Sequence, residues 1–139
     1  MSNKYILLVE DNMDDILLTE RAFALCHISE NLLIMHDGQA LLDFFQSQKI
    51  NEDTLQGDKP SVILLDLNLP KISGLDILRM IRTNADTRMI PVIILTSSKE
   101  DRDISEIYRL GVDEYIRKPT SFSEFTQIIR RLKAKWIDN

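Results

Sequence analysis

Cysteine and glycine are both scarce in this chain. The single cysteine, Cys26, cannot form an internal disulfide, which fits a reducing compartment and a role as a small buried hydrophobic residue. The four glycines form neither the G-x-G-x-x-G nor the G-x-x-x-x-G-K pattern of nucleotide-binding loops. The sequence therefore argues against a nucleotide-binding module.

Excess positive charge and long apolar runs are also missing. The net charge of −5 argues against nucleic acid as a main partner, because contacts to phosphates need a basic surface. The apolar run before Glu10 is too short for a signal peptide or a membrane span. We therefore expect a cytoplasmic protein without membrane or nucleic-acid partners.

Length and composition favour one domain with a proper core. The chain has 139 residues, of which 44% are hydrophobic. No linker and no internal repeat divides it, so we expect a single domain over residues 1–139. The same reading predicts no output domain, which would separate this protein from transcription factors.

Short apolar runs alternate with segments of helical spacing along the whole chain. The run at 62–65 is continuous and bounded by turn residues, as in a strand buried on both faces. Five strands are expected at 5–9, 31–36, 62–65, 91–95 and 114–117, and five helices follow them in turn. This order predicts an α/β doubly wound fold, in which right-handed crossovers join parallel strands and helices cover both faces.

The expected helices have recognisable start signals and apolar stripes. A short helix is expected at 40–45, and the polar residues 47–60 are expected to form a loop. The start signals are Asn12 or Asp11, Ser73 with Asp76, Ser98 with Asp101, and Ser121 with Glu124. The apolar stripes are Met13, Ile16, Leu17 and Ala24 in the first helix, Leu75, Leu78 and Ile81 in the third, and Phe122, Phe125, Ile128, Ile129, Leu132 and Trp136 in the last.

Polar residues follow four of the five strands. Ligands of open parallel sheets bind at the carboxyl ends of the strands, where these side chains are expected to meet. Carboxylates gathered there repel one another and favour a bound cation, and oxygen ligands in an open site suit Mg²⁺. Carboxylates, a lysine and a hydroxyl together indicate phosphoryl transfer to an aspartate. The residues are Glu10 and Asp11, then Asp66, then Thr96 and Ser97, and finally Lys118.

Each of these residues alone has a simpler structural explanation. Asp66 could cap a turn, and Glu10 with Asp11 could be a charge pair at the start of a helix. Thr96 could be an ordinary β-branched strand residue, and Lys118 a solvated surface lysine. Their joint occurrence at the ends of the expected strands favours the functional explanation.

The sequence resembles the receiver domain of two-component response regulators. The residues that carry the resemblance are Glu10-Asp11, Asp66, Thr96 and Lys118-Pro119, together with Leu67-Asn68-Leu69-Pro70 and Gly74. The resemblance covers essentially the whole chain. It implies a flavodoxin-like sheet of order 2-1-3-4-5 and a cis peptide bond before Pro119. It also implies a phosphoacceptor that catalyses its own phosphorylation and dephosphorylation and is not a conventional enzyme.

The resemblance implies a role for each site residue. Asp66 would accept a phosphoryl group from a histidine kinase, in a Mg²⁺-dependent reaction. The metal ligands would be Asp11, Asp66 and the backbone carbonyl of Asn68, with Glu10 acting mostly through water. The phosphoryl oxygens would be bound by Lys118, Thr96 and the amide of Ser97, where most receivers carry alanine or glycine. Tyr115 would act with Thr96 as a switch, although a half-buried strand tyrosine is the simpler explanation.

A finer resemblance links the chain to the stand-alone regulators that are paired with bacterial phytochromes. It depends on residues 6–12, the loop before Pro60, residues 95–100 and a C-terminal tail with Trp136. It implies a phytochrome-type kinase as partner, and a homodimer through the fourth helix, the fifth strand and the fifth helix. In such a dimer the C-terminal residues, including Trp136, would reach the partner subunit. The simpler explanation is that Trp136 covers the core of its own chain, because it continues the apolar stripe of the last helix.

A Mg²⁺-dependent phosphohydrolase is the alternative function. Phosphatases of the haloacid dehalogenase type use a second aspartate, two residues after the nucleophile, as general acid. Asn68 stands at that position here, and an amide cannot perform acid catalysis. For the response regulator, the resemblance also implies a downstream partner protein, which would bind a phosphorylation-sensitive face.

Overall fold

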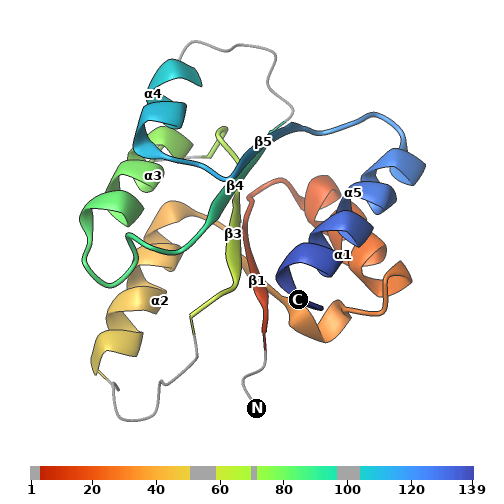
Figure 1. Ribbon diagram of the computed structural model, residues 1–139, viewed down its shortest axis with the longest axis horizontal. Coiled ribbons are helices and arrows are strands. Elements are labelled where there is room, and N and C mark those ends of the chain that lie inside the picture. The colour runs from red at the N-terminus through yellow and green to blue at the C-terminus, as the bar shows by residue number, and fades with distance from the viewer. Residues whose placement is uncertain (1–3, 51–58, 70–71, 97–103) are drawn as a thin grey trace.

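The computed structural model describes residues 4–50, 59–69, 72–96 and 104–139, and five parallel strands form its central sheet. Their order in space is β2-β1-β3-β4-β5, which confirms the predicted order and the flavodoxin-like fold (Figure 1). The connections place helices on both sides of the sheet. The strands are β1 (Ile6–Val9), β2 (Leu32–Met35), β3 (Val62–Leu65), β4 (Val92–Thr96) and β5 (Glu114–Arg117).

Helices cover both faces of this sheet. Helices α1 and α5 lie together on one face, and α2, α3 and α4 cover the other (Figure 1). Among the described residues, no helix is long and apolar enough to cross a membrane. The helices are α1 (Met13–Leu25), the short 3₁₀ helix η1 (Ser29–Asn31), α2 (Gly38–Ile50), α3 (Gly74–Thr83), α4 (Ile104–Leu110) and α5 (Phe122–Trp136).

Alternate residues of each strand enter two separate cores, one on each side of the sheet. In β1, Ile6 and Leu8 pack toward α1 and α5, whereas Leu7 and Val9 pack toward α2, α3 and α4. This alternation follows from the two-residue period of a strand, and both faces are apolar because helices cover both. All four residues of β1 and all four of β3 are buried, as the continuous apolar runs predicted.

The predicted start signals of three helices are confirmed. The side chain of Asn12 accepts a hydrogen bond from the Asp15 amide at the start of α1. Ser73 and Ser121 accept corresponding bonds at the starts of α3 and α5. Helix α4 ends at Leu110, and the next residue, Gly111, has φ +98°, a left-handed conformation that glycine adopts readily. The predicted signal of Ser98 with Asp101 lies outside the described residues.

Two predictions about helices were wrong. Helix α2 runs to Ile50, beyond the predicted 40–45 and into the predicted loop at 47–60. The Asp37 carboxylate accepts a hydrogen bond from the Ala40 amide at 2.7 Å, so the helix begins earlier as well. In α1 only Ile16 of the predicted apolar stripe is buried, since Met13 is 58% and Leu17 57% exposed.

The buried face of α1 includes a polar residue. It consists of Ile16, Thr19, Ala22 and Phe23, which follow the helical period. The Thr19 hydroxyl donates a hydrogen bond to the Asp15 carbonyl oxygen at 2.7 Å, so its burial leaves no polar group unpaired. Hydrophobicity alone therefore predicted Met13 and Leu17 as buried residues of α1, whereas in the structure Thr19 is buried and these two are exposed.

The stripe of α5 packs as predicted. Phe125, Ile129 and Leu132 are buried in the core shared with α1, and Phe122 and Ile128 cover its edge. Trp136 also packs against this core, which confirms the simpler of the two explanations for this residue.

Candidate functional site

The carboxyl ends of β1 and β3 bring two buried acids together. Glu10 is 1% and Asp66 5% exposed, and each directly follows its strand. The Asp66 amide donates a hydrogen bond to the Val9 carbonyl at 3.2 Å, and the Glu10 amide donates to the Met35 carbonyl at 3.0 Å. The backbone pairing of the sheet therefore continues past the strands and fixes both acids.

The acids form a cluster that could hold a cation. Ligand oxygens of Glu10, Asp11 and Asp66 all lie within 4.8 Å of one another, and the Asp11 side chain is exposed to solvent. Three carboxylates at this spacing, with one side open to water, provide the hard oxygen ligands that Mg²⁺ or Mn²⁺ prefers. The residues present therefore fit a divalent cation.

Within this cluster, Glu10 has a strongly raised pKa. Burial, and next a hydrogen bond with Asp66, raise the pKa of Glu10 from 4.5 to about 7, although Lys118 acts to lower it. Without a cation, Glu10 therefore tends to keep its proton near neutral pH. A divalent cation would replace that proton, because it provides the compensating positive charge.

Lys118 joins the site from the end of β5. Its ammonium group forms an ion pair with Glu10, lies 2.9 Å from the Asp15 carboxylate, and lies 4.0 Å from Asp66 Oδ2. Burial lowers the pKa of Lys118, but the hydrogen bonds to Glu10 and Asp15 and the charges of Glu10 and Asp66 together raise it more, so the pKa lies above its ordinary value. The side chain is thus a fixed positive charge beside the Asp66 carboxylate.

The loop after β3 shapes the other side of Asp66. The Asn68 amide donates a hydrogen bond to Asp66 Oδ1 at 3.3 Å, while the Asn68 side chain is exposed. Gly74, at the start of α3, packs closely against this loop: a Cβ atom there would lie 2.6 Å from the Asp66 carbonyl oxygen and from the Leu67 Cα. Only glycine fits this approach of α3 to the loop.

Thr96 and Tyr115 occupy neighbouring strands next to this site. Thr96 is fully buried at the end of β4, and its carbonyl accepts a hydrogen bond from the Lys118 amide at 2.8 Å. Tyr115 is half-buried in β5 and packs beside Tyr108 of α4, with ring centroids 6.4 Å apart. Ser97 lies outside the described residues.

At the site, one prediction from the sequence was wrong, and one residue that contacts Lys118 was not predicted. The resemblance implied a cis bond before Pro119, but Lys118–Pro119 is trans, the form that X-Pro bonds favour by about 0.5–1 kcal/mol. The missed residue is Asp15, the second partner of Lys118. A signal for it existed, because Asp15 falls in the first turn of the helix that follows Glu10 and Asp11 and so lies near the same edge of the sheet.

Comparisons with known proteins agree with this geometry. The family model for the response regulator receiver domain matches residues 6–130. The chain is 35% identical over 135 residues to response regulator Rcp1 of Synechocystis sp., and this match covers 97% of the chain and 90% of Rcp1.

Solved structures give the same result. The Mn²⁺-bound form of Rcp1 superimposes with a TM-score of 0.79 and 34% identity, covering 98% of this chain and 96% of that one. The phosphorylated cyanobacterial phytochrome response regulator RcpA has a TM-score of 0.78 and 32% identity, with coverages of 97% and 94%. The bacteriophytochrome response regulator AtBRR has a TM-score of 0.73 and 37% identity, with coverages of 95% and 94%. The chain is therefore a member of the response regulator receiver domain family.

Proposed function

We propose that this protein is a single-domain cytoplasmic response regulator that accepts a phosphoryl group on Asp66 from a histidine kinase. The observation that carries the proposal is the place of the Asp66 carboxylate, between the acidic cluster and the Lys118 ammonium group 4.0 Å away. An Asp66 oxygen would attack the phosphorus atom of the donor. The bond between phosphorus and the donor's imidazole nitrogen would break, and its electron pair would return to that nitrogen. With a proton on the other ring nitrogen, the kinase is left with a neutral imidazole and Asp66 with an acyl phosphate.

The residues around Asp66 support this step. The Lys118 ammonium group can bind a phosphoryl oxygen as a point charge, and the Thr96 hydroxyl and the Ser97 amide are proposed as further donors. In this proposal, Thr96 and Tyr115 transmit the change to the surface. Tyr115 already packs beside the exposed Tyr108, so its movement would alter the surface of α4.

Mg²⁺ is the proposed cation, with Asp11, Asp66 and the Asn68 carbonyl as its ligands and Glu10 acting mostly through water. When bound, the cation would offset the charge that develops on the phosphoryl oxygens. Support comes from the spacing of the three carboxylates and from the Mn²⁺-bound structure of the similar regulator Rcp1.

A phytochrome-type histidine kinase is the proposed donor. The similar regulator RcpA is described as a cyanobacterial phytochrome response regulator, and AtBRR as a bacteriophytochrome response regulator. A direct test is phosphotransfer from purified, autophosphorylated kinases of the host. Transfer to this protein should be fastest from the phytochrome-type kinase, and a preference for an unrelated kinase would overturn this assignment.

The acceptor residue is tested with acetyl phosphate. With Mg²⁺, the wild-type mass should rise by one phosphoryl group, and Asp66→Asn should abolish the labelling. Asp14→Asn is the matched control, because it removes one exposed carboxylate of α1 that no described contact links to Asp66. Labelling that persists in Asp66→Asn would refute the proposal, and many rounds of phosphate release from a phosphate monoester would favour the phosphohydrolase instead.

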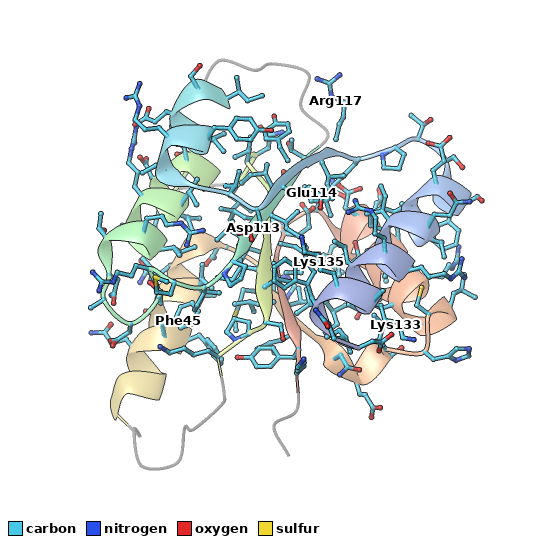
Figure 2. The ribbon with its side chains drawn as sticks, in the orientation of Figure 1. Phe45, Asp113, Glu114, Arg117, Lys133 and Lys135 are labelled. Atoms are coloured by element: carbon cyan, nitrogen blue, oxygen red, sulfur yellow. The ribbon has the colours of Figure 1, made fainter. Side chains whose placement is uncertain are left out.

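We further propose a homodimer through α4, β5 and α5. Tyr108 of α4 is 56% exposed, although it is large and aromatic, and it adjoins β5, where Glu114 and Arg117 are labelled in Figure 2. Trp136 is not proposed as part of this contact, since it packs on its own core.

Sedimentation velocity at micromolar concentration, with and without phosphodonor, tests the dimer. We expect Tyr108→Glu to weaken association, whereas Met89→Glu, at an 85% exposed residue before β4, should not. A monomer under both conditions would rule the dimer out.

A further inference from the structure

We propose that Asp15 is a positioning residue that competes with the phosphorylated Asp66 for Lys118 and thereby weakens binding of the phosphoryl group. This inference depends on the function proposed above, because it concerns the same site. The observation behind it is the contact between the Lys118 ammonium group and the Asp15 carboxylate at 2.9 Å, which is shorter than the 4.0 Å between Lys118 and Asp66.

Asp15 is held firmly at the start of α1. Its amide donates a hydrogen bond to the Asn12 side chain at 2.9 Å, and its carbonyl accepts the Thr19 hydroxyl at 2.7 Å. Because Thr19 is buried against the sheet, this segment of backbone has little freedom to move. The carboxylate of Asp15 therefore has a defined position relative to the end of β5.

The single ammonium group of Lys118 lies near three carboxylates. In the structure its ammonium group contacts Glu10 and Asp15, and Asp66 is the most distant of the three carboxylates. Phosphorylation of Asp66 replaces the single negative charge of its carboxylate by a phosphoryl group that carries about 1.5 to 2 negative charges and three acceptor oxygens. Lys118 would then turn toward the phosphoryl group, and its contact with Asp15 would lengthen or break.

There is space for such a change. A groove between α1 and the segment after β5 is lined by Asp15, Leu18, Lys118 and Phe122. The Asp15 side chain is 31% exposed and the Lys118 side chain 11%, so water can replace the lysine at Asp15 once the contact breaks. Loss of a partly exposed ion pair has a small energetic effect, so the competition should be modest.

The test compares Asp15→Asn with Asp14→Asn. Both variants lose one negative charge from the first turn of α1, but only Asp15 contacts Lys118. Beryllofluoride, an analogue of the phosphoryl group, is titrated at fixed Mg²⁺ and its bound form is followed by fluorine NMR. We expect Asp15→Asn to reduce the half-saturating concentration about three- to fivefold, as expected when one partly exposed ion pair is lost. Asp14→Asn and the charge-conserving Asp15→Glu should stay within about twofold of the wild type on the same scale.

A second readout does not require phosphorylation. The side-chain NMR signals of Lys118 should shift in Asp15→Asn and not in Asp14→Asn, because only the first loses a charged partner of the ammonium group. Unchanged or weaker binding of beryllofluoride by Asp15→Asn would overturn the competition. Failure of the wild type to bind beryllofluoride would instead overturn the proposed function itself, so the two failures are distinguishable.

Discussion

Replacement of Glu10 by Gln should stabilise the metal-free protein at alkaline pH and have little effect at acidic pH. The folded-state pKa of Glu10 is raised to about 7 from 4.5, mainly by burial and then by its hydrogen bond with Asp66. Between these two values the folded state binds more protons than the unfolded state does. The stabilisation from the bound proton is therefore complete below pH 4.5 and is lost as the pH rises through about 7.

The magnitude follows from the size of this shift. A rise from 4.5 to about 7 corresponds to about 3 kcal/mol of unfolding free energy that the wild type loses above pH 7. A glutamine at this position stays neutral and does not undergo this loss. We therefore expect Glu10→Gln to match the wild type near pH 5 and to exceed its unfolding free energy by about 2 to 3 kcal/mol near pH 8.5.

Urea unfolding in EDTA at the two pH values measures this difference. Asp14→Asn is the control, because it removes an exposed carboxylate and should show no comparable dependence on pH. Saturating Mg²⁺ should favour the wild type, since a cation that binds only the folded state stabilises it by mass action. A pH-dependent difference below about 1 kcal/mol between Glu10→Gln and the wild type would refute the assigned cause.

Two further predictions concern the metal and the loop after β3. Asp11→Ala should weaken Mg²⁺ binding at least tenfold in an amide NMR titration, because it removes the exposed carboxylate of the cluster, and unchanged affinity would contradict its role as a ligand. Gly74→Ala should lower the unfolding free energy by about 1–3 kcal/mol and also weaken Mg²⁺ binding, since its methyl group would meet the backbone at Asp66 and Leu67. The atoms nearest to the new methyl group in Gly38→Ala belong to the side chains of Ile77 and Ile72, so a loss of stability without loss of Mg²⁺ affinity is expected there.

The order of the elements and the location of the site were predictable from the sequence. The runs at Ile6–Val9 and Val62–Leu65 are apolar at every position, and such strands require helices on both faces. Strands joined by helices run parallel, so their carboxyl ends share one edge. The cluster of Glu10, Asp11 and Asp66 follows from this arrangement, because Glu10 and Asp66 directly follow β1 and β3 and Asp11 is the next residue after Glu10.

The tertiary structure alone decided which partners these residues have. Asp15 and Lys118 are 103 positions apart, and their contact depends on how α1 lies against the end of β5. The position of Asp15 in the first turn of α1 indicates the edge of the sheet at which it lies, but no local pattern encodes its contact with Lys118. Nor does a local pattern encode the burial of Thr19 in place of Met13 and Leu17. Local periodicity determines an element and its direction, whereas the packing of distant elements determines which face is buried and which charges meet.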